Sequence, residues 1–174
     1  MNIFILSKNH TRNAAYHIDK HVGKMIVEVA QQLSSAFFII SPMIANQYQQ
    51  EHEIYKPAYL KHPCTIWCSQ SLENFLWACE YGISLGKEFK SRYGKIHKST
   101  IVVQKLKELS PSTDVFPKQG LTDFAQAIPD KYKDQSAISA YRQYYRNDKR
   151  KFATWKTHNP PKWFNGELTD TSFE

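Results

Sequence analysis

The side chains best suited to chemistry form one polar row near the N-terminus. Its members recur at three- or four-residue steps and are His17, His21, Lys24, Glu28, Gln31 and Ser35. Side chains at these steps share one face of an α-helix. A glutamate beside a lysine provides a general base, or a carboxylate that stabilises a cationic sugar-like transition state. We predict that Glu28 and Lys24 are catalytic, Lys24 through a Schiff base, and that Lys20 and both histidines bind the ligand.

Metal binding and a purely structural role are the alternatives for these residues. The histidines of the row, with Glu28, have metal-ligand character, but the His-Glu-x-x-His signature of zinc proteases is absent. His62, Cys64 and Cys68 offer three ligands, yet no second Cys-His pair follows. Such cysteines are more often small core residues, and Lys24 with Glu28 is also an ordinary surface ion pair. We predict neither a metal nor a cofactor.

Cations and aromatic residues elsewhere suit a phosphate-bearing ligand. His62 precedes a proline that fits the first position of a helix, where backbone N–H groups attract an anion. Basic and aromatic segments at 90–98 and 141–151 suit phosphates and stacked bases. A solvated amphipathic helix with its tyrosines in the core is the alternative for the second segment. The further residues predicted to bind ligand are His62, Arg92, His97, Lys98, Arg142, Tyr145 and Lys149.

The composition agrees with a polyanionic partner. The 174 residues carry a formal charge of +7, which favours DNA, RNA or a nucleotide. Three cysteines without framework spacing indicate a reducing compartment, and the apolar runs are too short to span a bilayer. We expect a cytoplasmic protein. The sequence has no Gly-rich phosphate loop, no G-x-S-x-G elbow and no Rossmann fingerprint, which argues against those enzyme classes.

Helices must position these residues. Apolar residues at three- and four-residue steps predict a mainly α, compact single-domain bundle, with two long helices and a short extended N-terminal segment. Gly82 and Gly86 permit a close helix crossing, and Gly94 ends a helix. We place one domain at 1–165 and an acidic tail at 166–174. The predicted elements are an extended segment at 2–6, helices at 13–38, 64–93, 99–109 and 136–155, a loop or weak helix at 43–53, and an arm at 159–164 that docks aromatic side chains.

Six motifs together resemble a family of small bacteriophage proteins. In chain order they are H-x-D-K-H-V-x-K-M-x-x-E-x-A-Q-x-L, Y-K-P, H-P-C-x-x-W, R-Y-G-K-x-H-K-S, P-D-x-Y-K and A-Y-R-x-Y-Y. The resemblance extends over nearly the whole chain. The family is loosely labelled as similar to pyrimidine-dimer DNA glycosylases. The resemblance implies a compact helical fold, DNA as substrate and glycosidic cleavage assisted by a carboxylate, the role that would fall to Glu28.

The N-terminus departs from the dimer glycosylases. Those enzymes use the amine of a threonine that is exposed when the initiator methionine is removed. The second residue here is Asn2, whose size should keep Met1 in place. We therefore expect Lys24 or Lys20 to supply the amine.

Two functions from different classes remain open. The first is a DNA-directed enzyme that acts on a damaged or modified base, with Trp67, Tyr145 or Trp163 stacking on the extruded base. The second is a non-catalytic nucleotide-binding sponge, expected to form a homo-oligomer, that sequesters a host immune signalling nucleotide. A weaker third reading is a protein that blocks a host nucleic-acid enzyme.

Overall fold

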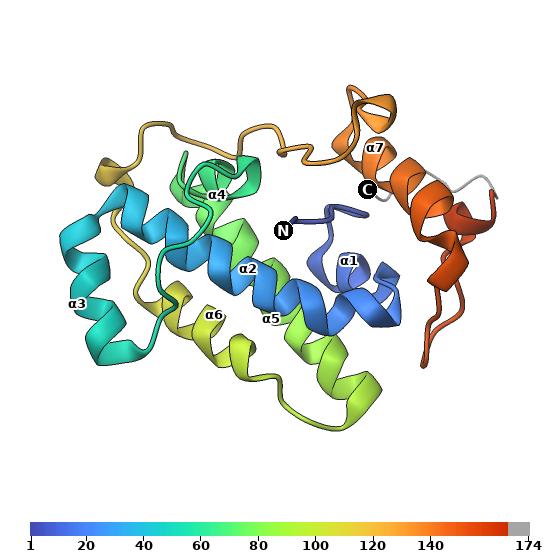
Figure 1. The fold of residues 1–174 in the computed structure, drawn as a ribbon, viewed down its shortest axis with the longest axis horizontal. Helices are drawn as coiled ribbons and strands as arrows, with labels where there is room; N and C mark the ends of the chain where they lie inside the picture. The colour runs from blue at the N-terminus through green and yellow to red at the C-terminus, as the bar shows by residue number, and fades with distance from the viewer. Residues whose placement is uncertain (167–174) are drawn as a thin grey trace.

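The computed structural model describes residues 1–166, and within that range the protein is all-α, without strands (Figure 1). The predicted mainly α class is confirmed, and the two long helices are α2 and α5, with 22 residues each. The α-helices are α1 His10–Tyr16, α2 Asp19–Ile40, α3 Pro42–His52, α4 Pro63–Cys68, α5 Leu72–Tyr93, α6 Lys98–Glu108 and α7 Ala137–Tyr144.

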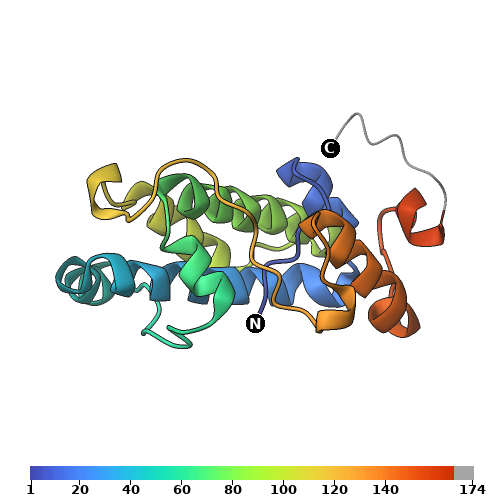
Figure 2. The same ribbon diagram turned by 90° about the horizontal axis from the view of Figure 1, so that it is seen from above.

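Helices α2 and α5 run antiparallel and form the centre of the protein, with α6 packed against both (Figures 1 and 2). Two glycines of α5 make this packing possible. A Cβ at Gly82 would lie 2.9 Å from a methyl group of Val29 on α2, and a Cβ at Gly86 would lie 2.4 Å from the side chain of Thr100 on α6. The predicted close crossing is confirmed, because any larger side chain would push the helices apart.

The single helix predicted at 13–38 is wrong, because the chain forms α1 and α2 with a break between them. His17 and Ile18 have extended backbone, with ψ of 134° and 154°. The buried guanidinium of Arg92, from α5, donates to the carbonyl oxygens of Ala15 at 3.0 Å and His17 at 2.9 Å. These bonds satisfy carbonyls that the end of α1 leaves unpaired. A side chain distant in sequence therefore supports the break.

The second predicted helix, 64–93, is also interrupted. Helix α4 ends at Cys68, and α5 begins after Ser71, whose hydroxyl accepts a 3.1 Å bond from the N–H of Asn74 as an N-cap. Gly94 ends α5 at a φ of 69°, as predicted. The third predicted helix agrees with α6 to within a residue at each end, and the segment 43–53 is largely the regular helix α3.

The last predicted helix, 136–155, has regular α geometry only in α7. It continues as a π-helix, Tyr145–Lys149, and a 3₁₀ turn, Arg150–Phe152. The predicted docking arm is confirmed, since Trp163 and Phe164 are both buried. They belong to another 3₁₀ turn, Lys162–Asn165. The remaining 3₁₀ turns in the described part are Thr113–Val115 and Asp130–Tyr132.

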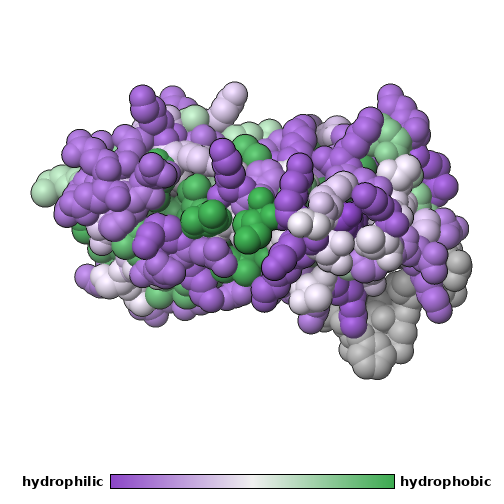
Figure 3. Space-filling model, turned by 90° about the horizontal axis from the view of Figure 1, so that it is seen from below, coloured by the Kyte–Doolittle hydropathy of each residue, from purple (hydrophilic) through white to green (hydrophobic). Residues whose placement is uncertain are grey.

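Most of the outer surface is polar, with an apolar area on the side seen in Figure 3. Helix α6 forms that edge of the molecule in Figure 1, and Ile96 and Ile101 there are 63% and 59% exposed. Across residues 1–166, no helix is both long and apolar enough to span a membrane. The predicted acidic tail lies almost entirely outside the described residues.

Candidate functional site

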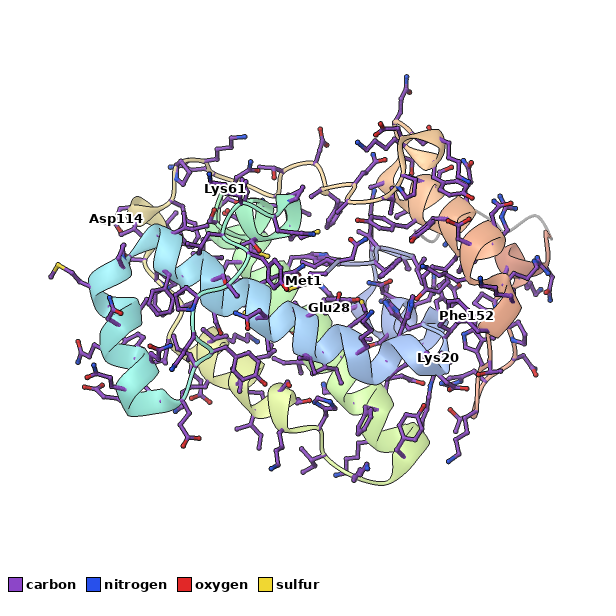
Figure 4. The ribbon with its side chains drawn as sticks, in the orientation of Figure 1. Met1, Lys20, Glu28, Lys61, Asp114 and Phe152 are labelled. Carbon is purple, nitrogen blue, oxygen red and sulfur yellow. The ribbon has the colours of Figure 1, made fainter. Side chains whose placement is uncertain are left out.

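The carboxylate of Glu28, only 12% exposed, lies beside two amines. Its Oε2 accepts a 2.7 Å hydrogen bond from the backbone N–H of Asn2 and lies 4.0 Å from the α-amine of Met1. Its Oε1 lies 3.5 Å from Nζ of Lys24, one helical turn earlier. Figure 4 shows Met1 directly beside Glu28 on α2. The polar row thus receives an amine from the chain terminus as well as its own lysine.

The side chain of Asn2 fixes the N-terminus in this position. Its Nδ2 donates to the carbonyl of Ala127 at 2.8 Å, and its Oδ1 accepts from the hydroxyl of Tyr141 at 2.7 Å. Oδ1 also accepts from the backbone N–H of Ile3. The next residues, through Leu6, are buried, so the predicted extended lead-in passes through the interior. Hydrophobic burial and a satisfied amide together hold Met1 at Glu28.

His62 and Cys64 lie on the other side of the N-terminus. His62 caps α4, with its Nδ1 accepting a 3.1 Å bond from the N–H of Cys64. Burial, followed by the positive charge of the chain terminus, lowers the pKa of His62. The thiol of Cys64 points at Oδ1 of Asn2 from 3.6 Å, and burial raises its pKa to about 11. The thiol therefore stays protonated at neutral pH and is a poor nucleophile.

The two histidines of the row are enclosed. His17 is fully buried, its Nδ1–H donates to the carbonyl of Asn13 at 2.7 Å, and its Nε2 accepts from the hydroxyl of Tyr81 at 2.8 Å. Burial lowers the pKa of His17 to about 4 and that of His21 to about 3. Neither ring carries a positive charge at neutral pH, so neither provides a cation for the predicted contacts with phosphate.

Arg92 and Tyr145 have internal partners instead of the predicted ligand. Arg92 is 3% exposed and makes ion pairs with Asp19 at 2.9 Å and Glu88 at 2.6 Å. Tyr145 is fully buried, and its hydroxyl lies 2.6 Å from Nδ1 of His21. Both side chains hold elements together, and neither faces solvent where a ligand would bind.

The remaining predicted ligand residues are distributed over two regions. Arg142 donates to the carbonyl of Leu6 at 2.9 Å and stands over the ring of Trp163. Lys20 and Lys149 lie near each other, since both stand over the ring of Phe152. The second region, where His97 caps α6 and the following Lys98 is exposed, belongs to the α5–α6 connection.

The far end of the polar row has a structural role. The hydroxyl of Ser35 donates to the carbonyl of Ala58 at 2.7 Å, and the amide of Gln31 donates to the carbonyl of Lys56 at 2.8 Å. These bonds hold the extended connection between α3 and α4 against α2. The candidate catalytic groups of the row are therefore Lys24 and Glu28.

Metal binding finds no support in the geometry. Over the part of the chain that the structure describes, no three His, Cys, Asp or Glu side chains are grouped to hold a metal ion. Cys64, Cys68 and Cys79 are buried free thiols, and burial raises the pKa of each. Cys64 and Cys68 are core residues of α4.

Comparisons of the chain with protein-family models, with curated protein sequences and with solved structures find no match.

The sequence favoured Lys24 or Lys20 over the N-terminal amine and did not indicate Asn2 as a site residue, whereas the structure places the Met1 amine and Asn2 at Glu28. The buried run from Ile3 to Leu6 was the available signal, because an apolar lead-in carries the chain terminus into the core. Its partner, Glu28, is 26 residues away from Asn2 in sequence. No local pattern connects the two.

Proposed function

We propose that this protein is a DNA-directed enzyme of the glycosylase and lyase type, acting on a damaged or modified base. The observation that carries the proposal is the Glu28 carboxylate, 12% exposed and beside the amines of Met1 and Lys24. A carboxylate and an amine are the two groups that a Schiff-base glycosylase requires. The resemblance to phage proteins labelled as glycosylase-like points in the same direction.

The α-amine of Met1 is the better nucleophile of the two. The side chain of Met1 is 12% exposed, so its amine lies in a partly enclosed position beside Glu28. It is also held in place, whereas the side chain of Lys24 is 65% exposed and able to move. Lys24 then contributes positive charge toward a phosphate near the carboxylate.

The proposed reaction uses only these groups. Glu28 accepts a proton from the ammonium group, and the freed lone pair attacks C1′ of the deoxyribose. The N–C1′ bond forms as the glycosidic C1′–N bond breaks, and the base leaves with the bonding electrons and takes up the proton held by Glu28. The attached nitrogen then loses a proton to Glu28. Its lone pair forms the C=N bond as the C1′–O4′ bond breaks, and O4′ takes up the proton from Glu28, which gives the protonated Schiff base. The carboxylate stabilises the positive charge that develops on the sugar.

Borohydride trapping tests this proposal. The protein is incubated with DNA that contains abasic sites or damaged bases, and borohydride reduces any Schiff base to a stable adduct. Mass spectrometry of the digested adduct identifies the attacking amine, and intact mass establishes whether the chain begins at Met1. We expect the adduct on Met1. An adduct on Lys24 would transfer the nucleophile role to that residue, and no adduct on any substrate would reject the proposal.

Glu28→Gln tests the carboxylate separately. The amide keeps an acceptor for Asn2 but loses the charge and the basicity, so we expect trapping to slow by roughly 100-fold or more. Lys118→Gln, in an exposed loop, is the matched control and should trap at the wild-type rate. Wild-type trapping by Glu28→Gln would remove this carboxylate from the mechanism.

A further inference from the structure

Three lysines and three aromatic rings form one cluster where α2 meets the C-terminal helical run. The aromatic residues predicted to stack on a base, Trp67, Tyr145 and Trp163, are all buried, as is Tyr132 of this cluster. Tyr144 and Phe152 are only partly buried and are the better candidates for contacts with bases. Figure 4 shows two of its members, Lys20 and Phe152, side by side, with Glu28 further along α2. The cation–aromatic cluster consists of Lys20, Lys131, Tyr132, Tyr144, Lys149 and Phe152.

Each lysine of the cluster stands over a ring. Nζ of Lys149 lies 4.4 Å from the ring centre of Tyr144 and 5.9 Å from that of Phe152, while Nζ of Lys20 lies 5.0 Å from Phe152. Nζ of Lys131 lies 4.7 Å from the ring centre of Tyr132. The Tyr132 and Tyr144 rings are 5.4 Å apart, which joins the two halves of the cluster. Three separate chain segments thus meet in one cluster, joined through the buried ring of Tyr132.

The lysines of the cluster keep their charge available. Within residues 1–166, none of the three ammonium groups forms an ion pair with a carboxylate. The acid inside the cluster is Asp148, which accepts a 2.6 Å hydrogen bond from the hydroxyl of Tyr132. Tyr132, followed by the charge of Asp148, raises the pKa of Lys131, so that lysine stays charged. Three cations against one engaged carboxylate leave a net positive surface, which attracts phosphates.

The π-helix after α7 creates this arrangement. Lys149 follows Tyr144 by five residues, and in an α-helix side chains five residues apart point roughly 140° away from each other. The wider π turn, Tyr145–Lys149, brings the two onto one face and directs Tyr145 inward. Single π turns inside helices are frequent at functional sites.

We infer that the cation–aromatic cluster binds an unpaired nucleotide strand and delivers it to Glu28. A surface that alternates cations with rings suits phosphates and exposed base faces together, whereas a duplex uses the cations alone. On binding, the ammonium groups move from the rings to phosphates, and bases take their place. Lys20, Lys24 and Glu28, at four-residue steps, continue the path over about 12 Å of α2. The inference rests on the proposed function, because it names the form of DNA that enters the same site.

Fluorescence anisotropy with a short labelled single strand, its duplex form and inorganic polyphosphate as competitor tests the inference. Tyr144→Leu and Phe152→Leu keep apolar bulk but remove the aromatic face. We expect each substitution to weaken single-strand binding about five-fold or more and to leave the affinity for polyphosphate unchanged. Lys149→Gln should weaken the binding of both the single strand and polyphosphate, and Lys118→Gln should weaken the binding of neither. Thermal melts verify folding, and Lys149→Gln, at the surface, still tests the cluster if Tyr144→Leu unfolds.

The outcomes separate this inference from the proposed function. Duplex binding as tight as single-strand binding, or ring variants that bind like wild type, would overturn the single-strand assignment. Glu28→Gln should bind the strand at least as tightly as wild type, because the substitution removes a negative charge beside the phosphates and the carboxylate acts after binding. A protein that binds the strand but forms no borohydride adduct would retain the surface and lose the enzyme. A protein that forms the adduct on duplex DNA alone would retain the enzyme and lose the surface.

Discussion

Glu28 accepts a 2.7 Å hydrogen bond from the backbone N–H of Asn2, and this bond joins the chain terminus to α2. The bond holds the α-amine of Met1 within 4.0 Å of the same carboxylate. Asn2 does not act on the ligand in our proposal. Its side chain sets where the amine lies, so the site depends on packing as much as on its charged groups.

Asn2→Ala should loosen the N-terminus and destabilise the fold by about 1–3 kcal/mol, because the hydroxyl of Tyr141 and the carbonyl of Ala127 lose a partner in the interior. Urea unfolding measures the loss, and amide hydrogen exchange at the first residues should accelerate. Asn46→Ala, at an exposed position on α3, is the control. Equal stability of the two variants would show that the Asn2 amide does not anchor the chain.

Arg92→Met should destabilise the protein by about 3–5 kcal/mol, because it removes the donor to the carbonyls at the end of α1 and the cation that pairs with Asp19 and Glu88. Asp19 still accepts from the backbone N–H of Lys156, and Glu88 still contacts the ring of His158. Lys90→Met, an exposed residue of the same helix, should change stability by less than about 0.5 kcal/mol. Chemical denaturation of both variants measures the difference. A loss below about 1 kcal/mol in Arg92→Met would contradict the role of this side chain in joining α1, α2 and α5.

Stability should fall as the pH drops below about 6.5. The pKa of His17 is lowered by burial to about 4, so between these values the unfolded chain binds a proton that the folded chain does not. His17 costs no stability above pH 6.5, and the loss grows to about 3 kcal/mol as the pH falls to 4, below which it levels off. The lowered pKa of His21 adds in the same direction.

Urea unfolding at a series of pH values measures this slope, and His17→Gln should make it shallower. The substitution keeps a polar side chain for the hydroxyl of Tyr81 and removes the titrating group. Identical pH profiles for the two proteins would indicate that His17 does not titrate as its burial requires.

Gly86→Ala should destabilise the protein by about 1–3 kcal/mol, although alanine is the better helix former. The added methyl group would lie 2.4 Å from the side chain of Thr100, so α5 and α6 must separate. Ser84→Ala, on the same helix, is the control for propensity. Thermal melts distinguish them, and a Gly86→Ala variant more stable than wild type would mean that the crossing is not tight.

The sequence alone determined the helical class, the two long helices and the glycines that let them cross. These features follow from local rules, because an apolar stripe at three- and four-residue steps specifies a helix face. It also identified Lys24 and Glu28 as neighbours, since residues four apart on one helix must be close. The helix end at Gly94 and the docking of aromatic residues of the C-terminal arm were also predictable, because both depend on local sequence.

Only the tertiary structure decided which charged residues face solvent. A histidine or an arginine can bind a ligand or hold elements together, and the residue type does not distinguish the two roles. His17 and Arg92 have internal partners because elements distant in sequence bury them. The break between α1 and α2 depends on a guanidinium from α5, and the Met1 amine reaches Glu28 because the first residues pass through the core. Long-range packing sets each of these positions, and local sequence patterns do not report contacts between segments that are far apart in the chain.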